Sequence, residues 1–158
     1  MAEKLKIVPM EEHHLDDLAA LERLCFAEPW TRPCLAAELN KPGAVFAVAE
    51  LDGKVAGYAG MNCVLDECYV DDVAVFPQYR RQGIALALMN GLIRAARARG
   101  AAFVTLEVRE SNAPAVALYE KLGFQAAGRR RGFYRCPDED AVIYTLYFSA
   151  KDRLEGSL

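Results

Sequence analysis

The six residues from Arg80 to Ala85 (Arg-Arg-Gln-Gly-Ile-Ala) constrain this chain more than any other segment. They follow a strand-like stretch and precede a long alanine- and leucine-rich stretch that is typical of a helix. The first N–H groups of a helix lack intrahelical acceptors, and the helix dipole places positive charge there. Gly83 and the small Ala85 leave room for a phosphate to approach this backbone, and the two arginines add positive charge. The segment therefore predicts a phosphate-binding turn, although a basic loop with one glycine also occurs without that role.

The distribution of charge agrees with an anion site in the middle of the chain. The net charge is only −3, but residues 78–135 hold eleven Lys and Arg against three Asp and Glu, a net charge of +8. The rest of the chain carries −11. The turn is neither a Walker loop nor a Rossmann fingerprint, because it lacks Gly-Lys-Ser/Thr and has only one glycine.

Length and composition indicate a folded domain. The 158 residues are 53% hydrophobic, which excludes a disordered chain and predicts a single domain over residues 1–158. No apolar run approaches the ~18 residues of a membrane span, and the first residues lack the apolar stretch of a signal peptide. A cytoplasmic protein with no membrane partner is therefore expected.

The cysteines and histidines indicate neither a disulfide bond nor a metal site. The five cysteines are odd in number and no two are spaced as Cys-x-x-Cys, so reduced thiols are expected. His13 and His14 are neighbours in a polar helix start, and no further ligand lies at metal spacing. The sequence therefore predicts no metal site.

Hydrophobic periodicity and turn residues predict an α+β fold with a mixed, mostly antiparallel sheet flanked by helices. The expected element order is β-α-α-β-β-β-α-β-α-β-β, in which the helix after Val75 supplies a crossover connection. Asp52-Gly53 marks a hairpin turn, and Thr31 and Gly100 mark a helix start and a helix end. The strands are expected at 4–8, 44–50, 54–64, 68–75, 103–108, 124–132 and 141–148, and the helices at 12–25, after Thr31, at 83–99 and after Asn112.

A second group of motifs follows the phosphate turn. Residues 106–112 read Leu-Glu-Val-Arg-Glu-Ser-Asn, and residues 117–124 read Ala-Leu-Tyr-Glu-Lys-Leu-Gly-Phe. In this order and spacing, the three motifs resemble the GNAT superfamily of N-acetyltransferases, most strongly over residues 69–124. The chain is also similar to the bacterial ribosomal-protein-alanine N-acetyltransferases, through Phe26-Ala27-Glu28-Pro29-Trp30 and the segment from Arg130 to Tyr134. Ala85, at the second glycine of the family turn, and Phe133, at a common tyrosine, are minor departures.

The resemblance implies a GNAT fold and an enzyme that transfers the acetyl group of acetyl-CoA. It implies a protein N-terminus as acceptor, most specifically the N-terminal alanine of a small-subunit ribosomal protein. It also assigns Glu107 as the general base, acting directly or through water, and Tyr119, twelve residues later, as the acid that protonates the CoA sulfur. A solvated carboxylate at a strand end and a tyrosine in the core are the alternatives that the residues alone leave open.

The resemblance further assigns the residues that contact acetyl-CoA. The backbone of one strand would pair with the pantetheine arm and donate to the acetyl oxygen, and the turn would bind the pyrophosphate. Asn112 matches a CoA-contacting asparagine, but a helix N-cap explains it equally well. The complete set is Val73, Ala74, Val75, Arg81, Gln82, Gly83, Ile84, Ala85, Leu86 and Asn112.

The acceptor side rests on fewer residues. Trp30 and Tyr134 lie in segments that border the acceptor channel of this family, and either could instead be a packing aromatic. The run Arg129-Arg130-Arg131 is more typical of a solvated strand edge, with the CoA 3′-phosphate or ribosomal RNA as its partners if it binds anything.

Three other functions are compatible with parts of the sequence. The same chemistry could act on a lysine side chain or a small amine. A catalytically silent domain that senses acyl-CoA is a different class, and the intact Glu107 and Tyr119 argue against it. A nucleic-acid binder would fit the basic segment, but the chain lacks a stacking platform or a recognition helix.

Overall fold

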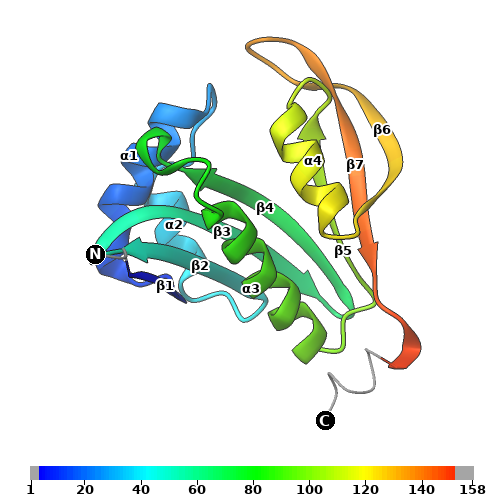
Figure 1. Ribbon diagram of the computed structural model, residues 1–158, viewed down its shortest axis with the longest axis horizontal. Coiled ribbons are helices and arrows are strands. Elements are labelled where there is room, and N and C mark those ends of the chain that lie inside the picture. Colours follow the sequence, from blue (N-terminus) through cyan, green and yellow to red (C-terminus); the bar gives the residue numbers. More distant parts are fainter. Residues whose placement is uncertain (1–3, 152–158) are drawn as a thin grey trace. The chain divides into compact units, whose positions relative to one another are not determined.

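A computed structural model describes residues 4–151 of the chain, and Figure 1 shows its elements. The order of strands and α-helices is the predicted one, with two short 3-10 helices added at Glu12–His14 and Pro77–Tyr79. The strands are β1 (Leu5–Pro9), β2 (Ala44–Leu51), β3 (Lys54–Val64), β4 (Glu67–Val75), β5 (Phe103–Arg109), β6 (Gln125–Tyr134) and β7 (Glu139–Tyr147). The helices are α1 (Leu15–Cys25), α2 (Arg32–Glu38), α3 (Ile84–Ala98) and α4 (Ala113–Lys121).

Seven strands form one mixed sheet, as predicted. The strand order is β1-β2-β3-β4-β5-β7-β6. Four strand pairs are antiparallel: β1 with β2, β2 with β3, β5 with β7, and β6 with β7. The pair β4 and β5 is parallel. A parallel pair needs a crossover connection, and α3 supplies it.

The chain divides into two compact units, which are described separately. The N-terminal unit comprises residues 4–63 and 71–95, and the C-terminal unit comprises residues 64–70 and 96–151. The organisation as a single domain stays a prediction.

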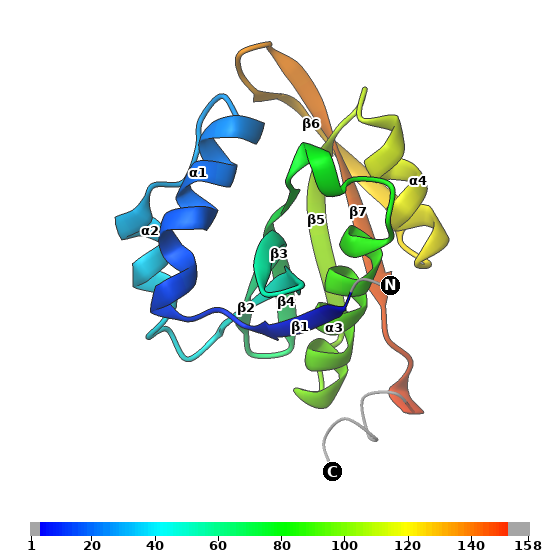
Figure 2. The same ribbon diagram turned by 60° about the vertical axis from the view of Figure 1, so that its left-hand side comes forward.

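In the N-terminal unit, helices cover both faces of the strands. Figure 2 shows α1 and α2 on one side of β2 and β3, and α3 on the other. One core cluster packs Leu15, Leu18 and Leu21 of α1 against strand residues that include Phe46 and Tyr58. The helical spacing of Leu15, Leu18, Leu21 and Leu24 predicts one buried face, and the first three are buried as expected. Leu24 is 60% exposed, so the prediction was wrong there, because nine residues after Leu15 the helix has turned to its opposite side.

In the C-terminal unit, the side chains of β5 alternate between two environments. Val104, Leu106 and Val108 are buried, whereas Thr105, Glu107 and the other intervening residues are half-buried. Successive side chains of a strand point to opposite faces, so Glu107 faces away from the buried side of this strand.

The cysteines differ from expectation. Cys63, at the end of β3, and Cys68, at the start of β4, are disulfide-bonded, while Cys25, Cys34 and Cys136 are free. The prediction of reduced thiols was therefore wrong for two of the five cysteines, because neither an odd number of cysteines nor the absence of Cys-x-x-Cys spacing excludes a disulfide bond. Across residues 4–151, no helix is long and apolar enough to cross a membrane.

Candidate functional site

The turn predicted to bind phosphate lies in the N-terminal unit and directly precedes α3, as the sequence predicts, and its backbone conformation adds detail. Arg81 and Gly83 adopt positive φ angles of 64° and 77°, so the chain coils tightly before α3 begins at Ile84. The N–H of Ala87 donates to the carbonyl of Gly83, which leaves the amides of residues 84–86 without intrahelical acceptors. A Cβ at Gly83 would meet no atom within 4 Å, so its left-handed φ, rather than lack of space, requires glycine there.

Arg80 has partners that the sequence did not indicate. Its Nε donates to the carbonyl of Val75 at 3.1 Å, and its Nη2 lies 3.3 Å from the Sγ of Cys25. This side chain thus connects the end of β4 to the end of α1, and its contribution of positive charge to the turn stays a prediction.

The strand segment Val73–Val75 lies beyond the region where β4 is paired with β5. On β4, only Glu67 to Tyr69 are paired with residues of β5. On β3, a Cβ at Gly57 would lie 2.6 Å from the carbonyl oxygen of Ala74, so glycine permits a close approach of the two backbones. Ala74 is packed in the core, whereas Val73 and Val75 are half-buried.

A buried polar network lies beside this segment and was missed by the sequence analysis. The hydroxyl of Tyr58 donates to Glu22 at 2.5 Å and lies 3.2 Å from Asp72. Glu22 is fully buried, and this burial, together with Asp72, raises its pKa to about 9. Glu22 is therefore protonated near neutral pH. An acidic residue on the apolar stripe of a predicted helix is the only signal that could have revealed it.

Glu107 of the C-terminal unit is also withdrawn from water. Its side chain is 6% exposed, and its Oε1 lies 2.8 Å from the Nε of Arg130 on β6. Burial raises the pKa of Glu107 above its ordinary value, and the charge and hydrogen bond of Arg130 oppose that rise. A desolvated carboxylate can accept a proton closer to neutral pH than a solvated one. Glu107 is thus not the solvated carboxylate of the alternative interpretation.

Tyr119 and Asn112 lie on α4 and at its start. Tyr119 is buried, and its ring lies 5.7 Å from that of Phe124. Asn112 is the N-cap of α4, because its side chain accepts from the N–H of Ala115 at 3.3 Å. The capping role of Asn112 is therefore confirmed, and its contact with CoA stays a prediction.

Tyr134 is held by an arginine of the same motif as Glu107. The guanidinium of Arg109 lies 4.5 Å from the centre of the Tyr134 ring and donates to the carbonyls of Pro137 and Arg135 at 2.8 and 2.9 Å. It also contacts Glu139 at 3.3 Å. Arg109 thus fastens the connection between β6 and β7, a role that the sequence did not indicate.

Trp30 packs in the N-terminal unit. Its ring lies 5.9 Å from that of Phe46, which in turn lies 6.3 Å from that of Tyr58. The interpretation of Trp30 as a packing aromatic therefore describes its contacts well. Of the other predicted site residues, Val73–Val75 and Arg81–Leu86 belong to the N-terminal unit, and Glu107, Asn112, Tyr119 and Tyr134 to the C-terminal unit.

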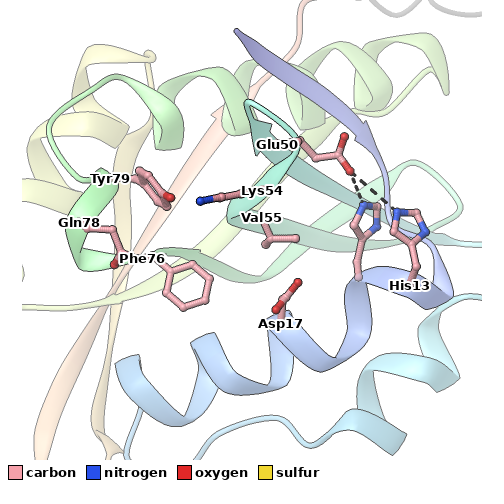
Figure 3. A pocket seen from close by; sticks show the side chains of 10 residues that line it. His13, Asp17, Glu50, Lys54, Val55, Phe76, Gln78 and Tyr79 are labelled. Carbon is pink, nitrogen blue, oxygen red and sulfur yellow. Dashed lines mark hydrogen bonds and ion pairs between the residues drawn. The ribbon is translucent and has the colours of Figure 1, made fainter. Parts of the chain in front are cut away.

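A cavity of about 410 Å³ in the N-terminal unit contains none of the predicted site residues (Figure 3). Its lining includes His13, His14 and Glu50, whose ligand atoms lie within 4.8 Å of one another. Folding thus adds to the histidine pair a carboxylate that lies far away in the sequence. However, the Nδ1 of His14 accepts from the N–H of Glu11 at 2.9 Å, so its Nε2 carries the proton that points to Glu50 at 2.8 Å. That nitrogen has no lone pair to offer a cation.

Comparisons with known proteins identify the family of this chain. The Acetyltransferase (GNAT) family matches residues 15–124. The chain is 41% identical over 131 residues to the ribosomal protein bS18-alanine N-acetyltransferase of Escherichia coli (strain K12), covering 82% of this chain and 88% of that protein.

Two solved structures are also similar to this chain. The crystal structure of the ribosomal-protein-S18-alanine N-acetyltransferase from Escherichia coli superposes with a TM-score of 0.85 at 37% identity, covering 92% of this chain and 95% of that one. Arabidopsis thaliana NAA60 in complex with acetyl-CoA shares the fold, with a TM-score of 0.83 at 20% identity, covering 92% and 99%.

Proposed function

Because the chain belongs to the GNAT family of acetyltransferases, we propose that it transfers the acetyl group of acetyl-CoA to the α-amine of a protein N-terminus. The acceptor we propose is the N-terminal alanine of a small-subunit ribosomal protein, in the cytoplasm. The similarity over most of both chains to a ribosomal protein bS18-alanine N-acetyltransferase supports this acceptor.

The observation that carries the chemistry is the desolvated carboxylate of Glu107. In the proposed reaction the amine nitrogen attacks the thioester carbonyl, and the C–S bond breaks as the C–N bond forms. An ammonium group cannot attack, so a base must first remove a proton. Burial brings the pKa of Glu107 toward the working pH, which suits this role.

Tyr119 is proposed as the group that returns a proton to the CoA sulfur. It lies on α4 of the same unit as Glu107 and is buried, so its hydroxyl is sheltered from bulk water. A sulfur that gains a proton as it leaves is a better leaving group than a free thiolate.

Acetyl-CoA is proposed to bind mainly to backbone groups. The unpaired amides at the start of α3 are directed toward the turn that would hold the pyrophosphate, which Arg81 and Gly83 shape. The backbone of Val73–Val75 would pair with the pantetheine arm, because the β4–β5 ladder stops before these residues. An N–H of this strand would then polarise the acetyl oxygen. Tyr134 is proposed to border the acceptor.

The test is an acetylation assay on synthetic peptides that differ only in their first residue. Peptides should begin with alanine, serine or glycine, and each should contain one internal lysine. A matched alanine peptide with a blocked N-terminus reports lysine acetylation alone. We expect one acetyl group on the alanine α-amine, located by fragmentation mass spectrometry, and none on the blocked peptide.

The same assay separates the alternatives. Modification of the blocked peptide would assign the activity to lysine. Transfer only to small amines, such as polyamines, would contradict the protein acceptor. Acetyl-CoA binding without transfer to any amine would favour the silent sensing domain.

A further inference from the structure

The proposed function leaves one feature of the sequence without a role, the run Arg129-Arg130-Arg131 on β6. Arg129 forms ion pairs with two partly exposed carboxylates, Glu110 at 2.8 Å and Asp140 at 3.4 Å. Arg130 differs, because its partner Glu107 is almost completely withdrawn from water. This ion pair involves the proposed base.

The sheet itself brings these two side chains together. Glu107 on β5 lies opposite Ile143 on β7, and Arg130 on β6 lies opposite Ala141 on the same strand. Ile143 and Ala141 are two residues apart, so both pairs face the same side of the sheet. The side chain of Arg130 reaches Glu107 by passing over β7 beside Ala141, whose side chain is only a methyl group.

The surrounding charges leave this pair isolated. On the same three strands, Arg109 is bound to Glu139, and Arg129 to Glu110 and Asp140. The positive charge of Arg131 helps to lower the pKa of Asp140. The titration of Glu107 responds to burial, which disfavours its charge, and to Arg130 and its own backbone N–H, which favour it.

We propose that Arg130 is a positioning residue for catalysis: it holds the buried carboxylate of Glu107 ionised and in a fixed orientation, ready to accept a proton from the acceptor amine. This inference rests on the proposed role of Glu107. Without a cation beside it, burial would raise the pKa of this carboxyl further, so a smaller fraction of Glu107 would be ionised and able to act as a base. The contact through Nε also fixes the direction of one carboxylate oxygen.

The decisive variant is Arg130→Gln, studied through the pH dependence of kcat/KM. The acid limb of this profile reports the free enzyme, in which Glu107 and Arg130 are paired. Without the guanidinium, the pKa of Glu107 rises and the acid limb moves to higher pH. We expect Arg130→Gln to lose about tenfold more activity at the acidic end of the profile than at the alkaline end, the size typical of a nearby opposite charge. The acceptor amine titrates identically in every variant, so it cannot cause a difference.

Two matched variants complete the experiment. Arg130→Lys keeps the positive charge but loses the hydrogen bond from Nε. The acid limb of its pH profile should therefore lie between those of the wild type and Arg130→Gln. Arg131→Gln removes the same charge from the neighbouring residue and should leave the limb in place. A uniform loss at every pH in Arg130→Gln would overturn the proposal, and so would an equal shift in Arg131→Gln.

A direct titration separates this inference from the proposed function. The side-chain carboxyl carbon of Glu107, labelled with ¹³C and assigned by its disappearance in Glu107→Gln, can be followed by NMR against pH. Its midpoint should move to higher pH in Arg130→Gln, and an unmoved midpoint would refute the inference whatever the activity. Full activity of Glu107→Gln together with a moved midpoint would instead refute the role of Glu107 as base.

Discussion

The phosphate turn and the surroundings of Glu107 are built by different means. The turn presents backbone amides, shaped by positive φ angles at Arg81 and Gly83, within one contiguous segment. Glu107 is a side chain whose properties depend on burial and on Arg130, which is 23 residues away in the sequence. A backbone site depends on local conformation, whereas a side-chain site depends on groups that only the fold assembles.

The largest effect is expected from removing the side-chain chemistry. Glu107→Gln keeps the shape but cannot accept a proton, so kcat/KM should fall by about 10²- to 10⁴-fold. Its dependence on pH should flatten, while the affinity for acetyl-CoA, measured by calorimetry, should change little. The matched control is Glu110→Gln, which removes a half-exposed carboxylate from the end of the same segment and should keep most of the activity. An unchanged rate in Glu107→Gln would remove this residue from its proposed role.

A smaller effect, on binding rather than chemistry, is expected at the turn. Gly83→Val forces a β-branched residue into a left-handed conformation, a strain of about 1–3 kcal/mol that the turn can relieve only by changing shape. The affinity for acetyl-CoA should fall about tenfold or more, while turnover at saturating acetyl-CoA falls less. Fluorescence or calorimetric titration of acetyl-CoA measures this change.

The N-terminal unit offers a matched control for that strain. Gly53 also has a positive φ angle, of 80°, and no atom within 4 Å of an added Cβ. Gly53→Val should therefore cost similar stability without weakening acetyl-CoA binding. Equal loss of affinity in both variants would mean that the phosphate does not bind at Gly83.

An effect of a different kind, on stability rather than on activity, is expected from the buried network of the N-terminal unit. The pKa of Glu22 is raised to about 9, so the folded protein holds a proton that the unfolded chain releases above its ordinary carboxyl pKa. The stability linked to this group is complete below the unfolded pKa and is lost as pH rises toward 9. The Tm of the wild type should therefore fall between pH 5 and 9, and Glu22→Gln should reduce that fall. An equal slope in both proteins would show that Glu22 titrates normally, and exposed Glu12→Gln is the control.

The fold was predicted well because its signals are local. The Asp52-Gly53 turn and the Thr31 N-cap each need only a few neighbouring residues, and both were confirmed. The leucine spacing of α1 was confirmed except at Leu24, which is exposed. The disulfide-bonded cysteines were missed because the spacing rule considered was too narrow. The acidic residue Glu22 was visible on an apolar helix face, but its partners Tyr58 and Asp72 were not.

The sequence by itself determined the element order, the GNAT motifs and the position of the turn before α3, because these depend on residues that are close together in the chain. It also singled out Glu107 and Tyr119. Only the tertiary structure decided the state of those side chains: that Glu107 is desolvated and paired with Arg130, and that Arg109 clasps the β6–β7 connection. The physical reason is that the pKa and orientation of an ionisable group are set by burial and by charges within a few ångströms, and strand pairing brings those charges from distant parts of the chain.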